Sequence, residues 1–404
     1  FIFLQIKKRK LMIESIFHTL PFTVCLFWSV IFLIEYRRAD PAKKLLTFFM
    51  IVCSFLYFSH AVYFNKNIPL FSVIESLYAF CTLAVYPLYY LYICKLTDPK
   101  PFQIKNYWIL IPSIVISLWA ALFYVLLDDN RISFVENNLF DSLQNVNNLS
   151  FAAKGQSYRL VIMKIVFIFQ LILICFFSLK KLIRFDKQIK NYYANTEEKE
   201  LTPIKRLLIV FIIYAFLSVI ANHVGRVFFL QEPWLVIIPS LIFSSMIFAI
   251  GYIGYKHILI TDELYKETNY DIADKSIVME TTQTPYMSSQ LGEAINQLME
   301  EKEVFRQKGL LITDVAREIG SNRTYVSNYI NKELNISFSE FINIYRIKFA
   351  QSLLTDTNQS YSMLEIIELS GFSHEGSFYR TFKKQTGLTP AQWREQQCSH
   401  IKSL

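Results

Sequence analysis

Glycine is scarce in this sequence, at 10 of 404 residues, and charged residues make up only 18%. The Walker, dinucleotide-binding and HExxH patterns are absent, which argues against nucleotide-binding loops and against a zinc-protease helix. The six cysteines include no Cys-x-x-Cys pair, and five lie within or at the end of apolar stretches, so neither a structural zinc nor a disulfide framework is expected. These absences exclude a small secreted scaffold and a glycine-rich nucleotide enzyme.

Apolar residues are abundant instead, at 53% of the chain, with 36 Phe and 24 Tyr. The mean hydropathy is +0.30, which is typical of membrane proteins. Roughly 20 helical residues cross a hydrocarbon core of about 30 Å. The sequence therefore predicts seven membrane spans within residues 1–255, at 13–34, 45–64, 68–93, 108–127, 160–179, 207–230 and 234–254. Six spans are the alternative, because Asn222, His223, Gly225 and Arg226 interrupt the sixth run.

The positive charge of the chain lies in its apolar part. The formal net charge is +8, yet residues 291–404 carry 13 Lys and Arg against 13 Asp and Glu. The connections after the first, third and fifth runs hold fifteen Lys and Arg, and the alternate connections hold five when Arg226, near the end of the sixth run, is counted with them. The positive-inside rule then places the odd connections and the C-terminal segment in the cytoplasm, with the N-terminus outside.

The basic group Lys7–Lys10 disagrees with this topology, because it would lie outside. The sequence begins with Phe, and Met12 directly precedes the first run. We expect Met12 to be the biological start. A signal peptide is the competing interpretation, although no Ala-x-Ala-like cleavage site follows the run.

Few ionisable side chains interrupt the predicted spans. The four that stand out form a possible intramembrane signal site, and they are His60, Glu75, Lys164 and His223. Charges inside a membrane are costly and by default suggest a function with a partner. One hypothesis is that Glu75 and Lys164 pair beside an outward-open pocket. The alternative is that they only fix helix packing, or that Lys164 extends toward the interface.

The composition changes after Tyr255. Residues 256–290 are polar and are predicted to be a cytoplasmic linker. Residues 291–404 contain two similar units, each with a short helix, a glycine turn and a longer helix, repeated at a shift of 51 to 52 residues. One long helix, Phe338–Leu354, capped by Ser337 or Ser339, joins them. This pattern predicts two helix-turn-helix motifs, the second helix of each lying in a DNA major groove.

The segment from Leu310 to Arg394 resembles the double helix-turn-helix DNA-binding domain of the AraC/XylS family of transcription regulators. The residues that carry the resemblance are Asp314-Val315-Ala316, Tyr325-Val326-Ser327, Ser337-Phe338, Tyr345-Arg346-Ile347, Ala350, Leu353-Leu354, Glu365-Ile366, Gly371-Phe372, Ser377-Phe378, Arg380, Phe382-Lys383-Lys384, Gly387 and Thr389-Pro390. Two positions depart from the family pattern: Ile367 stands where a small Ala is usual, and Asn328 where Arg is common.

Helical periodicity separates buried from outward-facing residues in the two longer helices. Val326, Ile330, Phe378 and Phe382 are the predicted core. The predicted DNA-contacting residues of the first helix are Arg323, Thr324, Ser327, Asn328 and Asn331. Those of the second are His374, Ser377, Arg380, Thr381 and Lys384. Each could also be ordinary solvated surface, although Arg, Asn and Lys can read base edges or bind phosphate.

The sequence as a whole predicts an all-α protein, with a polytopic membrane helix bundle followed by a cytoplasmic DNA-binding domain. We interpret it as a one-component transcription regulator of the bacterial inner (cytoplasmic) membrane. Its expected partners are promoter DNA, the lipid bilayer and an unidentified signal, with a homodimer left open. No enzymatic activity, cofactor or metal is expected. The alternative is a transporter or sensor in which the helix-turn-helix domain is only regulatory.

Overall fold

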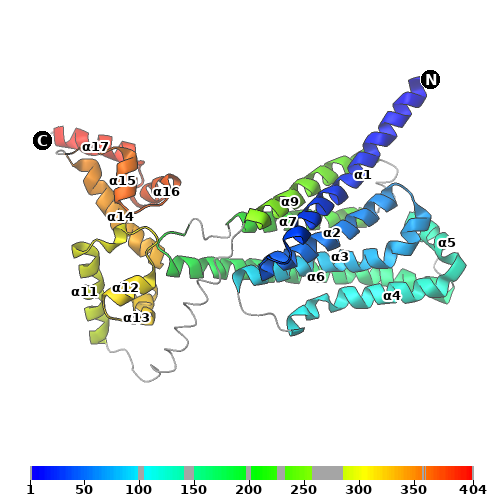
Figure 1. Cartoon of the computed structure of the whole chain (residues 1–404), viewed down its shortest axis with the longest axis horizontal. Coiled ribbons are helices and arrows are strands. Elements are labelled where there is room, and N and C mark those ends of the chain that lie inside the picture. Colours follow the sequence, from blue (N-terminus) through cyan, green and yellow to red (C-terminus); the bar gives the residue numbers. More distant parts are fainter. Residues whose placement is uncertain are drawn as a thin grey trace. The chain divides into compact units, whose positions relative to one another are not determined.

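The computed structural model describes residues 2–98, 104–140, 150–196, 202–224, 233–256, 285–356, 359 and 361–402. Every regular element in these ranges is a helix (Figure 1), which confirms the predicted all-α class. The chain divides into two compact units. Unit 1 comprises Phe1–Leu182 and Thr202–Asp262, and unit 2 comprises Ile183–Leu201 and Glu263–Leu404.

Six helical segments of the described chain are long and apolar enough to cross a membrane. Five of them lie in α1 (Ile2–Glu35), α2 (Pro41–Phe64), α3 (Ile68–Thr97), α6 (Phe151–Tyr192) and α9 (Ile237–Lys256). The sixth, Asn106–Val135, contains most of η1 (Ile104–Leu110) and all of α4 (Ile111–Leu127), η2 (Asp128–Asn130) and α5 (Arg131–Val135). The short helix η3 (Glu136–Phe140) follows it. The predicted run 207–230 corresponds to α7 (Thr202–Val224), and its residues 225–230 lie outside the described residues. A short η5 (Pro233–Val236) precedes α9.

Short, capped turns place consecutive helices of unit 1 beside one another. The Asp40 side chain accepts a hydrogen bond from the Lys43 amide at 2.8 Å, and Pro41 occupies the first turn of α2. The Asn67 side chain accepts one from the Leu70 amide at 3.2 Å at the start of α3. These caps satisfy amides that have no partner within the helix. As a result α1 packs against α2, and α2 against α3, while α9 packs against α1.

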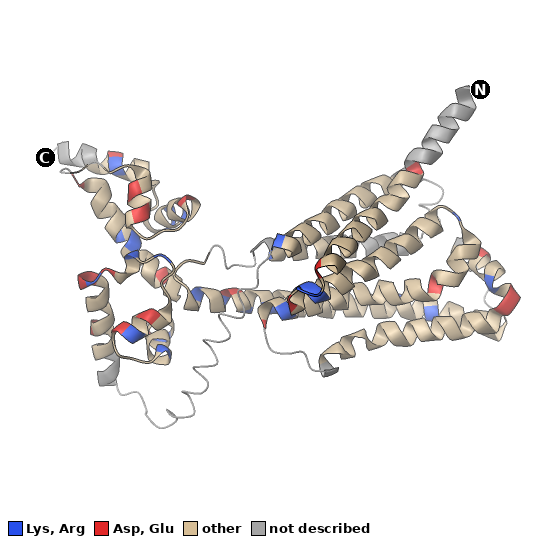
Figure 2. Ribbon diagram, in the orientation of Figure 1, with Lys and Arg blue, Asp and Glu red and all other residues tan. Residues whose placement is uncertain are grey.

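The outer faces of unit 1 expose large apolar side chains. Leu118 on α4, Phe169 and Ile172 on α6 are each more than 60% exposed. Figure 2 shows that Lys and Arg are rare along these helices and lie mostly near their ends. Many exposed apolar side chains on long helices are typical of contact with lipid.

Helix α6 is much longer than the apolar run 160–179 that predicts it. It has 42 residues and continues to Tyr192 through Lys180, Lys181 and Arg184. Hydropathy detects only the part that is apolar on every side, whereas a helix continues wherever one face finds packing partners. The division between units 1 and 2 falls within this helix, after Leu182.

Unit 2 contains the predicted repeat. Its elements are α11 (Pro285–Glu301), η6 (Val304–Arg306), α12 (Ile312–Glu318), α13 (Arg323–Asn328) continued by η7 (Tyr329–Glu333), α14 (Phe338–Thr355), α15 (Met363–Leu369), α16 (Glu375–Thr386) and α17 (Pro390–Lys402). Helix α11 begins inside the range 256–290 that the sequence assigned to a linker, because Pro285 is favourable at a first helical position. Residues 257–284 of that range lie outside the described residues.

Local signals fix the ends of these helices. Ser337, one of the two expected caps, accepts a hydrogen bond from the Glu340 amide at 3.2 Å. The Ser362 hydroxyl and amide both donate to the carboxylate of Glu365, and these bonds hold the pKa of that carboxyl below its usual value. Asn335 and Gly387 have φ of 55° and 79°, as expected for residues that end the two longer helices in the left-handed conformation.

The predicted core of unit 2 is confirmed. Val326, Ile330, Phe378 and Phe382 are all 0% exposed. Ile367, which departs from the family pattern, is buried in the same cluster as Phe378 and Phe382. The larger side chain is therefore accommodated within the second helix-turn-helix motif.

Two glycines of the second motif offer a matched test of this packing. Gly371 has φ of +80°, and a Cβ there would lie 2.6 Å from the carbonyl oxygen of Arg306, whereas a Cβ on Gly376 would meet nothing within 4 Å. Gly371→Ala should lower the free energy of unfolding of unit 2 by at least about 1–3 kcal/mol. Gly376→Ala should leave it unchanged or raise it by less than about 1 kcal/mol. Pulse proteolysis of the full-length protein in urea measures both, and equal effects would contradict the described turn.

Candidate nucleic-acid interface

Two helix-turn-helix motifs form the candidate interface. Helices α12 and α13 make the first and α15 and α16 the second, with α14 between them. Gly320 and Gly371 lie in the turns, with φ of 64° and 80°. Asn322 caps α13 by accepting a hydrogen bond from the Thr324 amide at 2.8 Å. We call α13 with η7 the first reading helix and α16 the second reading helix.

The two reading helices differ in how open their predicted DNA-contacting side chains are. On the first, all five predicted residues are half-buried: Arg323, Thr324, Ser327, Asn328 and Asn331. On the second, three are exposed, namely His374, Arg380 and Lys384, while Ser377 and Thr381 are half-buried. The second reading helix is thus the more accessible of the two.

Several of these polar side chains already have partners within unit 2. The Arg380 Nε donates to the carbonyl oxygen of Gly376 at 3.1 Å, along its own helix. The Lys384 ammonium lies 2.9 Å from a carboxylate oxygen of Glu340 at the start of α14. The Asn331 amide donates to the Ser327 hydroxyl at 2.9 Å. An exposed ion pair of this kind contributes little to stability, so Lys384 can exchange Glu340 for phosphate at small cost.

The electrostatic field of this domain is weak. Residues 291–404 have equal numbers of basic and acidic side chains, and Figure 2 shows both signs on the helices of unit 2. Nonspecific DNA binding depends on the number of phosphates that Lys and Arg neutralise. This domain therefore has to rely on a few well-placed contacts.

Helix α11 packs against η7 of the first reading helix and is also hydrogen-bonded to α14. The Tyr345 hydroxyl donates to the side-chain oxygen of Asn296 at 2.8 Å, which joins α14 to α11. Burial, with Glu300 nearby, raises the pKa of Tyr345, and burial also raises that of Tyr329. Both phenols are neutral at physiological pH, as a tyrosine with its ordinary pKa already is, and that of Tyr345 is a hydrogen-bond donor.

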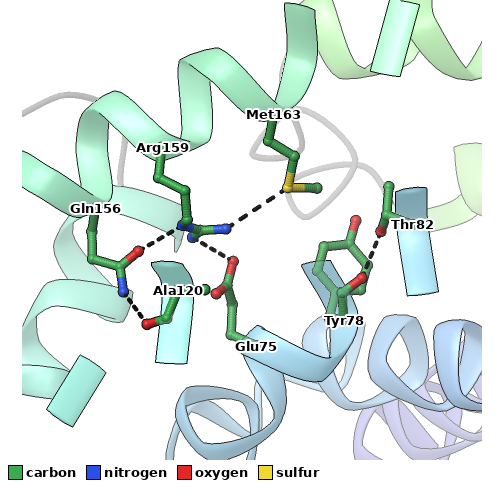
Figure 3. Close-up of polar contacts among 7 residues, drawn as sticks. All are labelled: Glu75, Tyr78, Thr82, Ala120, Gln156, Arg159 and Met163. Carbon is green, nitrogen blue, oxygen red and sulfur yellow. Dashed lines mark hydrogen bonds and ion pairs between the residues drawn. The ribbon is translucent and has the colours of Figure 1, made fainter. Parts of the chain in front are cut away.

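A buried polar cluster lies among α3, α4 and α6 in unit 1 (Figure 3). An Arg159 Nη donates to a carboxylate oxygen of Glu75 at 2.8 Å, and both side chains are almost fully buried. The Arg159 Nε donates to the Gln156 side-chain oxygen at 2.6 Å, and the Gln156 amide donates to the Ala120 carbonyl oxygen at 2.8 Å. Paired and hydrogen-bonded in this way, a charge can remain buried.

The hypothesis that Glu75 pairs with Lys164, one of the two interpretations of these residues, is wrong. Lys164 is exposed, and the partner of Glu75 is Arg159. Five residues on a helix correspond to a rotation of about 140°, so Arg159 and Lys164 point to different sides of α6. Arg159 directly precedes the apolar run 160–179, so hydropathy assigns it to a connection and not to a span.

The two histidines of the possible signal site are placed differently. His60 is half-buried, with its ring centroid 5.3 Å from that of Tyr57 and 5.5 Å from that of Tyr78. The side chain of His223 lies outside the described residues. The structure thus brings Glu75 together with Arg159 and Gln156, neither of which the sequence singled out.

Comparisons with known proteins concern the C-terminal part of the chain. Residues 315–396 match the family model described as a helix-turn-helix domain. Over 90 residues the chain is 36% identical to an uncharacterised HTH-type transcriptional regulator, YtdP, of Bacillus subtilis (strain 168), covering 22% of this chain and 11% of that protein. Over 88 residues it is 32% identical to the melibiose operon regulatory protein of Escherichia coli (strain K12), covering 22% of this chain and 28% of that one.

Among solved structures, the C-terminal domain of AraT, a response regulator from Geobacillus stearothermophilus, is 27% identical, with a TM-score of 0.24, over 29% of this chain and 88% of that chain. The matched part of this chain covers less than a third of the length of YtdP and of the melibiose operon regulatory protein. The C-terminal region carries an AraC-type helix-turn-helix domain, as the sequence predicted.

The buried pair of unit 1 can be tested by a double-mutant cycle. Glu75→Gln and Arg159→Gln should each destabilise unit 1 by about 3–5 kcal/mol, because each leaves the partner charge buried without its counter-charge. The double variant should be less destabilised than the sum of the two. Lys164→Gln, at an exposed position of the same helix, is the matched control and should have little effect. Strict additivity in thermal unfolding of the detergent-solubilised protein would show that the pair does not interact.

Proposed function

We propose that this protein is a membrane-embedded one-component transcription regulator. In this proposal the helices of unit 1 lie in the bacterial cytoplasmic membrane and respond to a signal, and unit 2 binds promoter DNA from the cytoplasm. The observation that carries the DNA-binding part is the AraC-type domain. Buried residues line one side of each longer helix, Val326 and Ile330 in the first and Phe378 and Phe382 in the second, so the other side lies outside the core.

The spacing of the two reading helices supports major-groove binding. Helix α14, which separates the motifs, has 18 residues, equivalent to about 27 Å at the helical rise. Successive major-groove entries on one face of DNA are about 34 Å apart, so this separation plus the adjoining turns is compatible with two entries. Because one chain supplies both helices, the recognised sequence need not be palindromic.

The apolar surface of unit 1 supports the membrane location. Side chains such as Leu118 and Phe169 are exposed on helices that are long enough to span a bilayer. The fifteen basic residues in alternate connections support a cytoplasmic location for unit 2. Promoter DNA and the bilayer are thus the proposed partners, and the proposed role is regulatory rather than enzymatic.

The polar cluster around Glu75 and Arg159 is the proposed point where a signal acts on unit 1. Ionisable groups inside a membrane bundle are costly and mark functional positions by default. The cluster joins α3 to α6. His60 of α2 packs against Tyr57 and against Tyr78, which follows Glu75 by three residues on α3. A signal that changes this pairing changes the packing of α6.

The DNA-binding proposal predicts the effect of Arg380→Ala on the second reading helix. If the guanidinium reads a base, the substitution should weaken binding of the selected promoter by about 1–3 kcal/mol and relax preference at one base position. Lys302→Ala is the control, because it removes the same charge from an ion pair with Glu318 outside the reading helices. The promoter is selected from DNA that is crosslinked to the protein in cells and recovered. The affinity of the full-length protein in nanodiscs for this DNA is then measured. Equal effects of the two substitutions would contradict the proposed interface.

The membrane proposal predicts the sidedness of the connections. A fluorescent-protein fusion after Arg38 should fluoresce, because that reporter folds in the cytoplasm, and an alkaline phosphatase fusion after Lys66 should be active outside. The reciprocal fusions serve as controls. Phosphatase activity at Arg38 would reverse the proposed topology and place unit 2 on the wrong side for DNA.

A further inference from the structure

The end of α6 is part of the DNA-binding unit. Residues Ile183–Leu201 belong to unit 2, and in their described part Phe185, Ile189 and Tyr192 are buried at helical spacing along one face. We call residues 183–195 the strap. Its basic residues Arg184, Lys187 and Lys190 are exposed, so in the sequence it resembles an ordinary basic loop after a membrane span.

The backbone of the strap pairs with the domain. Tyr193 forms an antiparallel bridge with Leu311, next to which the Ala194 amide donates to the Leu310 carbonyl oxygen at 3.0 Å. The hydroxyl of Ser339, in the first turn of α14, donates to the Ala194 carbonyl oxygen at 2.9 Å. The strap is therefore hydrogen-bonded both to the entry of α12 and to α14.

The side chain of Asn195 bonds the strap to α14 and to the second helix-turn-helix motif. Its oxygen accepts a hydrogen bond from Arg346 on α14 at 2.6 Å, and its amide donates to the Ser373 hydroxyl, just before α16, at 2.5 Å. One amide group thus contacts the central helix and the turn of the second motif. Hydrogen bonds to a charged donor are among the stronger ones in proteins.

The strap also engages the first reading helix. The guanidinium of Arg323, the first residue of α13, lies 4.8 Å from the ring centroid of Tyr192, which is fully buried. This distance is within the range of a cation–π interaction. The same guanidinium cannot stay on Tyr192 and also enter a DNA groove. The half-buried state of the first reading helix, compared with the open second one, agrees with this engagement.

We propose that the strap is an autoinhibitory contact, in which Tyr192–Asn195 holds the first reading helix away from DNA until α6 moves. This inference rests on the proposed function, because it assigns the regulation of the same interface. Helix α6 also carries Arg159, the partner of Glu75, so one continuous helix contains both the buried membrane pair and the strap. A signal that alters the packing of α6 then changes the fraction of molecules in which both reading helices are available.

Release of the strap should tighten DNA binding. Full-length protein in nanodiscs is titrated against a fluorescent duplex pool of random sequence, with fluorescence anisotropy as the readout. Asn195→Ala and Tyr192→Leu should each bind about threefold to tenfold more tightly than the wild type, because the apparent Kd falls as the competent fraction rises. Gln188→Ala is the matched control, because it truncates an exposed amide of the same strap and should not change the affinity.

Locking the strap should have the opposite effect. In the double variant Asn195→Cys and Ser373→Cys, a reductant-cleavable bifunctional thiol reagent should join two positions whose native side chains are hydrogen-bonded. The crosslinked protein should bind DNA at least about tenfold more weakly, and reductant should restore the affinity. Each single cysteine variant treated with the same reagent is the control. Because the lock is reversible, comparing the same double variant before and after reduction separates the effect of the lock from that of the two substitutions.

The outcomes separate this inference from the proposed function. If the released variants bind no more tightly and the lock leaves binding unchanged, the strap is not inhibitory, while loss of affinity in Arg380→Ala would still support a DNA interface. If the uncrosslinked proteins bind no DNA even at low salt, the proposed function fails and the strap has nothing to regulate. Hydrogen exchange of α14 verifies that each variant is folded.

Discussion

At the centre of unit 2, the guanidinium of Arg346 bonds three segments that are far apart in the sequence. It donates to the carbonyl oxygens of Phe305 and Gln307 at 2.7 and 3.0 Å and to the Asn195 side chain at 2.6 Å. The side chain is 1% exposed, so its charge depends on these acceptors, and the guanidinium also lies over the ring of Phe372. Leaving such a donor without its acceptors would cost far more than any one bond contributes. The segment before α12, the strap and the second motif are thereby held to α14.

The sequence could predict the helix-turn-helix part because its signals are local. Val326, Ile330, Phe378 and Phe382 repeat at helical spacing and are buried as expected, and Ser337, Asn335 and Gly387 mark helix ends by their own chemistry. The partner of Glu75 could not be predicted in the same way, because it depends on which sides of α3 and α6 meet. The contacts of the strap could not be predicted for a similar reason. Tyr193 pairs with Leu311 and Asn195 bonds to Arg346, and both partners lie more than a hundred residues away in the sequence.

In the proposed regulator, charge and packing have separate roles. The C-terminal region has no net charge over residues 291–404, so its attraction to DNA depends on individual side chains and on how many are available at once. A contact that occupies Arg323 changes that number directly. Coupling of a membrane signal to DNA requires an element with two arrangements whose balance both sites affect. Helix α6, with Arg159 in one unit and Tyr192 in the other, is the element that can provide it.

In the proposed regulator, one intact chain lies in the membrane and contacts DNA. Cells are crosslinked with formaldehyde, their membranes are isolated by flotation, and the DNA attached to the full-length protein is sequenced. We expect discrete promoter sites in the floated fraction, and we expect them to be lost in the Arg380→Ala variant although the amount of that variant in the membrane is unchanged. Recovery of the same sites from intact protein only in the soluble fraction, or floated DNA without discrete sites, would contradict this proposal.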